Sequence, residues 1–406
     1  MPYLTCHHYN SNWCKSCSLL GLSSAKQNED KIDRLNTLLA NYKESQAQSS
    51  ATISPLWTPP TIFPSRTKAK LSVSGTNDEP IIGLLDQSLN GKELLDCPLH
   101  LPIISRTIYI LKQLIIKYRL TPYSIPTRTG ELKYLIVNTT ADQSQLSLRF
   151  ILRSTESIPR IRKAVKDLLL LVPELKVASV NLQPIPHAIL EGEEEIPVTE
   201  DQLIWENYGA LSLAIAPQCF TQVTHQTAAA LYSYVAKLFS QAGYNNVLDL
   251  YCGIGCFSLY ISDFVETCLG IELSSSAISC AKLSAAKNLK HNLDFHSADA
   301  ETFLKSYSGQ KFDAVICNPP RRGLSQSIID NLCSMQPSSI VYSSCNPTTL
   351  FRDLALFSDH YSLKKLSPFD MFPLTSHLEV VAELDLKSPS LTRLNTSPNG
   401  TLESEI

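Results

Sequence analysis

The stretch Val247-Leu-Asp-Leu-Tyr-Cys-Gly253-Ile-Gly255 decides the fold class of this chain. It starts as a short apolar strand and ends in two glycines that open a helix, so the backbone can approach a ligand closely at the helix N-terminus. Three further apolar strands follow, and they read TCLGIEL, FDAVICNPP and SIVYSSCN. Because such strands alternate with helices from about Leu211 onward, the sequence predicts a doubly wound α/β domain with a mostly parallel sheet.

Polar residues stand at the carboxyl ends of these strands. Glu272 closes TCLGIEL, Asp299 follows the strand-like LDFHSAD, and Asn318 follows FDAVIC. In an open α/β sheet these positions share one edge, where ligands bind, and Glu272 is suited to accept hydrogen bonds from two ribose hydroxyls. Asp299 is equally compatible with a helix cap. Cys256 and Ser258 follow these glycines, and Ser258 stands in place of the third glycine of the G-x-G-x-x-G pattern of dinucleotide sites. The loop therefore favours a nucleoside without a pyrophosphate, such as S-adenosylmethionine.

Cys345, in the segment Val341-Tyr-Ser-Ser-Cys345-Asn-Pro, ends a strand on the same edge. Buried strand cysteines are usually inert packing, but we expect Ser343, Ser344 and Asn346 to surround this thiol with hydrogen-bond donors. A cysteine at this place suits methylation at C5 of uracil. That carbon is a poor nucleophile, and the addition of a thiolate to the neighbouring C6 activates it.

The same chemistry requires a base that removes the C5 proton. The segment Thr375-Ser-His377-Leu-Glu379-Val-Val offers two candidates. Burial in an apolar strand would raise the pKa of Glu379 into a usable range, although a strand carboxylate can equally serve a salt bridge. His377 is the alternative base.

Four of the twelve cysteines form a separate group. Cys6, Cys14 and Cys17 follow the spacing C-x7-C-x2-C, and Cys97 stands in the distant segment DCPL. In a long chain without an export signal, cysteines are expected to stay reduced or to bind metal. Four thiolates can ligate a 4Fe-4S cluster, while a CxxC pair with an adjacent histidine can hold zinc. The spacing alone is compatible with both.

Positive charge is concentrated between residues 101 and 170. This stretch holds twelve basic and four acidic residues and so carries +8, although the whole chain has a formal net charge of -3. A segregated basic region suits contact with the phosphates of a nucleic acid, and a solvated protein surface explains it equally well. Arg66, Lys68 and Lys70 lie on a predicted strand edge and are further candidates for RNA contact.

Composition divides the 406 residues into four parts. Residues 1–64 form a cysteine-bearing segment and a linker, and the fourth ligand of this segment is Cys97. Residues 65–210 form a mixed α+β module that suits RNA recognition. Residues 211–386 form the α/β domain, and residues 387–406 are expected to be a disordered tail. No apolar run approaches the ~20 residues that span a bilayer, and the N-terminus lacks the pattern of a signal peptide. We expect a cytoplasmic, monomeric protein without membrane contact.

Taken together, these motifs resemble the RNA uracil-C5 methyltransferases that carry an iron-sulfur cluster, whose catalytic domain is a Rossmann-like class I methyltransferase. The resemblance runs from Cys6 to about Leu386 and rests on DLYCGIG, GIEL, NPPRRGL, YSSCN and DMFPLTSHLEVV. It implies a nucleophile at Cys345, a base at Glu379 and a 4Fe-4S cluster on the four grouped cysteines. It also implies contacts with S-adenosylmethionine at Gln222, Tyr251, Glu272 and Asn318.

Two details refine the resemblance. Asn318 replaces an aspartate of sister branches, which favours the branch that methylates uracil 747 of 23S ribosomal RNA over the tRNA enzymes; another uridine of ribosomal or transfer RNA is the alternative target. The family usually has Gln-Thr-Asn where this chain reads Gln222-Val-Thr224, so the third position lacks an amide.

Two other classes of protein stay open. In an exocyclic-amine methyltransferase, Asn-Pro-Pro commonly precedes an aromatic residue, whereas Arg321 follows here, and that chemistry needs no cysteine. A catalytically silent RNA-binding or ribosome-assembly protein with the same fold is the second alternative. Cys345 and Glu379 count against it.

Overall fold

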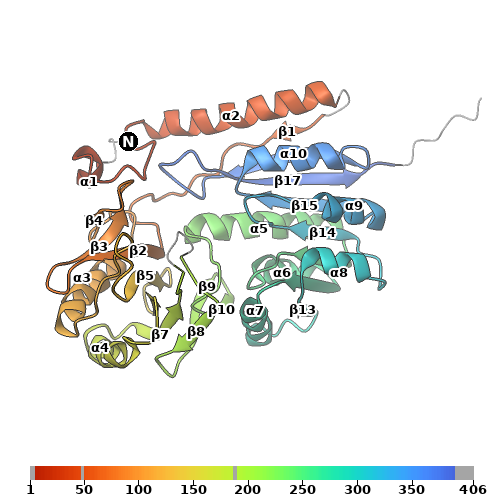
Figure 1. Cartoon of the computed structure of the whole chain (residues 1–406). Coiled ribbons are helices and arrows are strands. Elements are labelled where there is room, and N and C mark those ends of the chain that lie inside the picture. The colour runs from red at the N-terminus through yellow and green to blue at the C-terminus, as the bar shows by residue number, and fades with distance from the viewer. Residues whose placement is uncertain (1–4, 47–49, 186–189, 389–406) are drawn as a thin grey trace, which may run out of the picture.

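The computed structural model describes residues 5–46, 50–185 and 190–388, and two sheets organise this part of the chain (Figure 1). In the larger sheet, five of the seven neighbouring pairs are parallel, and β17 makes the two antiparallel ones. The predicted α/β fold with a mostly parallel sheet is confirmed. In spatial order its strands are β1 (Thr52–Ile53), β16 (Tyr361–Phe369), β17 (Glu379–Leu386), β15 (Ser339–Ser344), β14 (Ala314–Cys317), β11 (Asn246–Leu250), β12 (Thr267–Glu272) and β13 (Leu293–Ser297).

The four apolar strands predicted from the sequence are β11, β12, β14 and β15, and they lie side by side in the order β15-β14-β11-β12. From β11 the chain first builds outward through β12 and β13, and it then returns to add β14 on the other side of β11. The strand order therefore reverses between β11 and β14. In open α/β sheets, ligands bind in the crevice outside the carboxyl ends of the strands at such a point.

Helices cover both faces of the larger sheet, as expected for a parallel sheet with two buried faces. One face carries α2 (Ser24–Ser45), α8 (Ala300–Ser306), α9 (Gln326–Met335) and α10 (Pro347–Phe357). The other face carries α5 (His225–Ala242), α6 (Cys256–Ile261), η1 (Ser262–Phe264), α7 (Ser275–Lys287) and the hairpin of β9 (Ile204–Tyr208) and β10 (Leu211–Ile215).

The smaller sheet carries α3 (Pro102–Lys117) and α4 (Ile158–Leu171) on one face (Figure 1). Alternate residues of its strands, such as Leu71 and Val73, pack against these helices. Although β2 lies between β3 and β5, its pairing with β3 begins at Ser72, so Lys68 and Lys70 pair with β5 alone, on a part of β2 whose other side is a strand edge. In spatial order the strands are β4 (Gly91–Glu93), β3 (Pro80–Leu85), β2 (Lys68–Gly75), β5 (Leu132–Thr139), β6 (Leu146–Leu152), β7 (Leu175–Leu182) and β8 (Glu194–Pro197).

The N-terminal segment lies against the larger sheet, although it is far away in the sequence. After the short α1 (His7–Asn10), the long helix α2 packs beside α10 (Figure 1). The ammonium of Lys31 on α2 donates to Asp370 Oδ1 at 2.7 Å, and both side chains are buried. Removing one partner of such a pair leaves an uncompensated buried charge, which costs about 3–5 kcal/mol. This ion pair therefore ties α2 to the segment that leads into β17.

No helix within the described residues combines the length and the hydropathy that a membrane span requires. The tail predicted to be disordered lies outside the described residues, apart from residues 387 and 388.

Candidate active site

The loop after β11 owes its shape to left-handed backbone conformations. Tyr251, Gly253 and Gly255 have φ angles of 61°, 55° and 81°. A Cβ on Gly255 would lie 3.0 Å from ring atoms of Phe295 and 3.2 Å from Ala281 Cβ, so a side chain fits poorly there. A left-handed conformation is strained for a tyrosine, and strained residues of this kind gather at functional sites.

Asp249 braces this loop from inside the sheet. Its Oδ2 accepts hydrogen bonds from the backbone N–H of Ser258 at 3.2 Å and from the Ser258 hydroxyl at 2.6 Å, which joins β11 to α6. Burial raises the pKa of Asp249 to about 7, and the negative charge of Glu272 contributes to this shift. The Oδ1 atom is buried without a hydrogen-bond partner. The sequence showed Asp249 only as a strand residue, and its burial and its proximity to Glu272 come from the packing.

Tyr251, Glu272 and Asn318 lie at the carboxyl ends of three adjacent strands, as predicted. Glu272 is half-buried, and its Oε1 accepts a hydrogen bond from the backbone N–H of Ser274 at 2.9 Å. The backbone N–H of Asn318 donates to the carbonyl of Leu250 at 3.3 Å, so its side chain begins at the point where the strand order reverses. Among the described residues, no protein group is hydrogen-bonded to the Asn318 amide.

Gln222 belongs to the loop between β10 and α5, and its side chain is buried. Two residues later, the Thr224 hydroxyl donates to the carbonyl of Met371 at 3.0 Å. Thr224, which stands where the family usually has asparagine, therefore holds this loop against the segment that leads to β17. The Thr224 hydroxyl is therefore engaged in a hydrogen bond within the protein.

Cys345 and Glu379 meet at the edge of the sheet where β15 and β17 pair. Ser344 is paired with Val380 in the antiparallel register, which places Cys345 just beyond the end of β15 and beside Glu379, the first residue of β17. Glu379 is only 1% exposed, and its Oε1 accepts a hydrogen bond from the Ser343 hydroxyl at 2.6 Å. Burial raises the pKa of Glu379 to about 7.

The environment of the Cys345 thiol contains two opposing charges. Burial raises the pKa of this thiol, and the nearby negative charge of Glu379 raises it further. The guanidinium of Arg321 acts in the opposite direction through its positive charge and a hydrogen bond to the thiol. Arg321 therefore favours the thiolate form, which is the nucleophilic form of cysteine.

The expected ring of donors around Cys345 is not what the structure shows. Ser343 donates to Glu379, and the Ser344 hydroxyl and the backbone N–H of Asn346 bond to each other at 3.2 Å. The amide of Asn346 donates to the carbonyl of Arg321 at 3.1 Å, which holds the Arg321 segment next to Cys345. The sequence contained one signal for this contact, the arginine that directly follows Asn-Pro-Pro.

The two alternatives at Asp299 and His377 have different surroundings. Asp299 Oδ1 accepts hydrogen bonds from the backbone N–H and the hydroxyl of Thr302, at 2.9 and 3.0 Å, so it caps α8. His377 is exposed, and its ring packs edge-on against Phe372 with 5.9 Å between centroids. Partial burial and the nearby charge of Arg321 lower the pKa of His377.

Cys6, Cys14, Cys17 and Cys97 line one small cavity, although Cys97 is eighty residues away from Cys17. Burial raises the pKa of the Cys17 thiol to about 11, and the three other thiols add to this shift. The adjacent histidines face a different group: His8 Nε2 lies 2.7 Å from Asp96 Oδ1, and His7 Nε2 lies 3.5 Å from Asp96 Oδ2. The four cysteines that the sequence singled out are therefore gathered in one place.

The basic stretch from 101 to 170 is less free to contact phosphate than its formal charge indicates. Half of its twelve cations have carboxylate partners, many of them acids outside the stretch. Lys70 also pairs with Glu191, at 2.7 Å. The paired residues of the stretch are Arg106, Lys112, Lys117, Arg149, Arg153 and Arg160.

Comparison with curated proteins finds relatives that match nearly the whole chain. A protein of Yersinia enterocolitica is 36% identical over 381 residues, which are 94% of this chain and 99% of the relative. A protein of Glaesserella parasuis is 37% identical over 390 residues, 95% of this chain and 99% of the relative. Both are named 23S rRNA (uracil(747)-C(5))-methyltransferase RlmC.

A solved structure has the same fold over most of the chain. It is the Pyrococcus abyssi tRNA (uracil-54, C5)-methyltransferase in complex with S-adenosyl-L-homocysteine, with a TM-score of 0.73 and 24% identity. The alignment covers 91% of this chain and 85% of that one. The family model described as tRNA (Uracil-5-)-methyltransferase matches residues 25–386. Because this family model matches most of the chain and the two relatives are 36% and 37% identical to it, the chain belongs to the tRNA (uracil-5-)-methyltransferase family.

Proposed function

We propose that this enzyme transfers a methyl group from S-adenosylmethionine to C5 of uracil 747 in 23S ribosomal RNA. The names of the two relatives support this target. The observation that carries the reaction is the placement of a half-buried thiol, Cys345, beside a buried carboxylate, Glu379. These are the two groups that methylation at an unreactive pyrimidine carbon requires.

Each residue has one task in this mechanism. The Cys345 thiolate, favoured by Arg321, forms a bond to C6 of the uracil and thereby makes C5 nucleophilic. Bound S-adenosylmethionine would supply the methyl group that C5 takes up, with cleavage of its S–CH3 bond and S-adenosylhomocysteine as the leaving group. Glu379 then accepts the C5 proton, the C5–C6 double bond forms again, and the thiolate leaves C6. The target base must first leave its stack to reach this edge of the sheet.

We assign the cofactor site to Gln222, Tyr251, Glu272 and Asn318. Three observations support this assignment. The loop at Tyr251 is tight and left-handed, and the side-chain amide of Asn318 has no hydrogen-bond partner among the described residues. The carboxylate of Glu272 can accept hydrogen bonds from two ribose hydroxyls. Residues 211–386 then carry out methyl transfer, and residues 65–210 recognise RNA. We also expect the enzyme to act as a monomer in the cytoplasm, where ribosomal RNA is made.

Glu272→Ala should weaken the binding of S-adenosylmethionine roughly ten- to a hundredfold, because charge-assisted hydrogen bonds to the ribose are lost. Isothermal titration calorimetry measures this. Asp299→Ala is the matched control, since Asp299 already serves as a helix cap. If both variants bind the cofactor like the unmodified protein, the assignment of Glu272 is wrong. A loss at Asp299→Ala alone would move the ribose or adenine contact to that residue.

We further propose that the four grouped cysteines hold a 4Fe-4S cluster. Sulfur ligands of a tetrahedral zinc site lie only roughly 3.8 Å apart, given Zn–S bonds of about 2.3 Å. In the described part of the chain, His7, His8 and Asp96 form the group whose ligand atoms all lie within 4.8 Å of one another. The sulfur atoms of the four cysteines do not meet this limit, so they lie farther apart than the ligands of a zinc site. A cluster of four irons accommodates this wider spacing. It would join the N-terminal segment to the loop of Cys97.

Cys14→Ala should lose both iron and inorganic sulfide, and it should lower the melting temperature, because the joint between two distant segments is removed. Elemental analysis and calorimetry check this. Cys333→Ala, which changes a cysteine of α9, should keep the iron. Zinc instead of iron in the anaerobically purified protein would refute the cluster. Full stability and RNA affinity without it would refute its structural role.

Methyl transfer from labelled S-adenosylmethionine to unmodified 23S ribosomal RNA tests the proposed function. We expect label in 5-methyluridine at position 747. Label on an exocyclic amine would favour the other class of methyltransferase, and a protein that binds both substrates without transfer would be a silent RNA-binding protein. Loss of the same 5-methyluridine in a deletion strain would confirm the target in the cell.

A further inference from the structure

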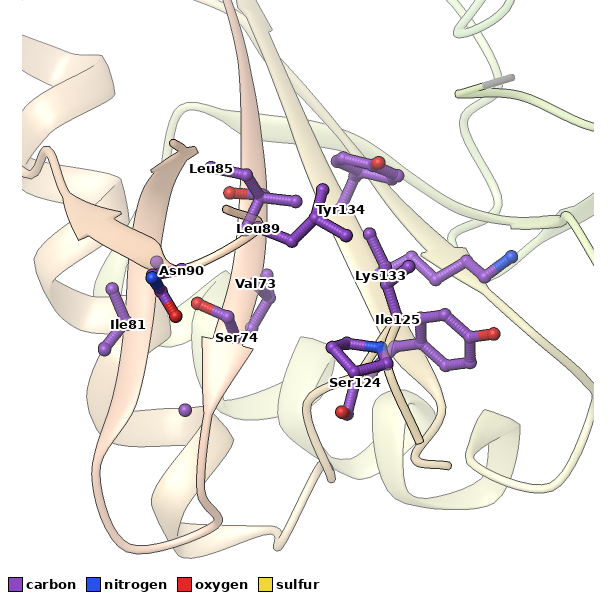
Figure 2. Close-up of a pocket in the computed structure, with 15 residues that line it drawn as sticks. Val73, Ser74, Ile81, Leu85, Leu89, Asn90, Ser124, Ile125, Lys133 and Tyr134 are labelled. Atoms are coloured by element: carbon purple, nitrogen blue, oxygen red, sulfur yellow. The ribbon is translucent and has the colours of Figure 1, made fainter. Parts of the chain in front are cut away.

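A cavity lies in the smaller sheet at the far end of β2, and the function proposed above does not use it. Its walls come from the hairpin of β2 and β3, from the turn at residues 86–90, from the segment at 123–126 and from β5 (Figure 2). The side chains that matter most in it are Ser74, Leu85, Leu89, Ile125 and Tyr134.

The cavity opens on the face of the sheet that looks toward the catalytic domain. Near the start of β2, the Lys68 ammonium donates to the carbonyl of Cys219 at 3.3 Å, in the loop that leads to Gln222. Side chains two residues apart on a strand share a face, so Ser72 and Ser74 lie on the same side as Lys68. The helices α3 and α4 cover the opposite face. From Lys68 to Ser74, β2 spans about 20 Å, so one extended ligand can reach both the catalytic domain and the cavity.

The lining suits a flat, neutral ligand with polar edges. Leu85, Leu89 and Ile125 provide apolar walls, and the ring of Tyr134 is half-buried beside Leu85 and Leu89 (Figure 2). The Ser74 hydroxyl oxygen is closed off from the cavity because it packs against Gly91, where an added Cβ would lie 2.0 Å from it. Within the described residues, no hydrogen bond engages the Tyr134 hydroxyl. An apolar slot that presents an aromatic ring with one unused hydroxyl matches the face and the edge of a nucleobase.

Among the described residues that line this cavity, Lys133 is the one with a charged side chain. The side chain of Lys133 points away from the centre (Figure 2), and its ammonium donates to the carbonyls of Gln183 at 2.6 Å and Ile185 at 2.8 Å. The ammonium also lies 4.8 Å from the ring centroid of Tyr123, another wall residue. Lys133 thus stiffens the wall and leaves the space neutral, which excludes a phosphate as the occupant.

The turn at residues 86–90 holds an apolar side chain out into this space. Asp86 Oδ1 accepts hydrogen bonds from the backbone N–H groups of Ser88 and Asn90, both at 2.9 Å, which fixes the turn. Leu89 has a φ of 65° and remains 45% exposed. A bulky residue rarely adopts this conformation. The site is therefore preformed, and its apolar wall lacks a cover from the described residues.

A cation stands next to the cavity. Ser124 and Thr129 pair across a short hairpin that continues from the wall at 123–126. This hairpin carries Arg128, which is exposed and has no carboxylate partner among the residues that the structure describes. Many other cations of the stretch from 101 to 170 are paired. Arg128 can therefore contact the phosphate of a nucleotide whose base enters the cavity.

We propose that this cavity binds a nucleobase of the RNA substrate, one other than the target uracil, in an unstacked position against Tyr134. This proposal rests on the function proposed above, because it assumes an RNA substrate. The smaller sheet would then recognise RNA by binding one unstacked base, while Arg128 contacts the phosphate next to that base. Such recognition of unstacked bases on aromatic side chains is how proteins commonly read RNA.

The test is the affinity for a fragment of 23S ribosomal RNA that contains uracil 747, measured by fluorescence anisotropy. Tyr134→Ala should weaken binding roughly ten- to a hundredfold, the usual effect of losing one stacked base. Tyr134→Phe keeps the stacking surface and should bind within a few-fold of the unmodified protein. Tyr109→Ala is the control, since this half-exposed tyrosine lies on α3, which covers the other face. Equal affinity of Tyr134→Ala and the control would overturn the proposal.

A second measurement identifies the base and guards against misfolding. Each nucleotide of the RNA is replaced in turn by an abasic one. At one position other than uracil 747, loss of the base should weaken binding to the unmodified protein. The same loss should leave the affinity of Tyr134→Ala unchanged. Leu89→Asn removes the apolar wall with a residue that tolerates positive φ, so it should fold and show the same insensitivity. If no abasic site is coupled in this way, the cavity does not bind a base.

The two proposals fail in different ways. If the unmodified protein neither binds nor methylates the RNA, the proposed function is wrong. If it binds and methylates the RNA while Tyr134→Ala and Leu89→Asn bind equally well, only the role of the cavity is wrong.

Discussion

Cys345→Ala is expected to lose methyl transfer at least about a thousandfold, because without the thiolate no bond to C6 forms and C5 stays unreactive. Binding of S-adenosylmethionine and RNA should persist, since the side chain is small and only half-buried. Single-turnover transfer of labelled methyl groups measures the first effect, and calorimetry and anisotropy measure the others.

A cysteine inside a strand of the same sheet, Cys268, supplies the control for this variant. Cys268 lies in β12, where its side chain is buried in the core. Cys268→Ala should keep most of the methyl transfer rate at a small cost in stability. If Cys345→Ala also keeps its rate, Cys345 is not the nucleophile, and the exocyclic-amine class of methyltransferase becomes the better explanation.

Glu379→Gln is expected to stop the reaction after methyl transfer, so that RNA remains covalently bound to Cys345. The amide cannot accept the C5 proton, and loss of a general base costs roughly a hundred- to ten-thousandfold in turnover. The Ser343 hydroxyl can still donate to the amide oxygen, so the fold should be kept. A protein–RNA band that resists denaturation, found without any substrate analogue, is the expected observation.

The pH dependence of turnover gives the same prediction a second readout. Burial raises the pKa of Glu379 to about 7, and only the ionised carboxylate accepts a proton. Below that pH, proton removal from the methylated covalent complex, which needs Glu379 alone, should slow about tenfold per pH unit in the unmodified enzyme. His377→Asn should retain both the rate and this profile. If His377→Asn instead stalls the covalent complex while Glu379→Gln turns over, the base is His377.

The sequence predicted those features that depend on short apolar runs and the polar residues that end them. The strands containing Val247, Cys268, Val315 and Val341 were found where expected, in adjacent positions. Because parallel strands point the same way, residues at their carboxyl ends must gather at one edge. That rule alone brings Tyr251, Glu272 and Asn318 together.

Contacts between distant loops could not be predicted in this way. Arg321 reaches the Cys345 thiol because Asn346 binds its carbonyl, and no periodic pattern encodes that fold of the loop. For a related reason, the net positive charge of residues 101–170 overstated how many of its cations are free to contact phosphate. Arg149 is buried and paired with Glu191 and Glu195, which lie outside the stretch and cancel its charge. The buried pair of Lys31 and Asp370 spans most of the chain.

The central claim is that the enzyme methylates C5 of a ribosomal uracil through a covalent bond to Cys345. The most direct test is incubation of the protein and S-adenosylmethionine with 23S ribosomal RNA fragments carrying 5-fluorouridine at position 747, whose fluorine Glu379 cannot remove as a proton. We predict a stable adduct that mass spectrometry of the digested protein locates on Cys345. Efficient methylation of the normal RNA without such an adduct, or an adduct on another cysteine, would contradict the account.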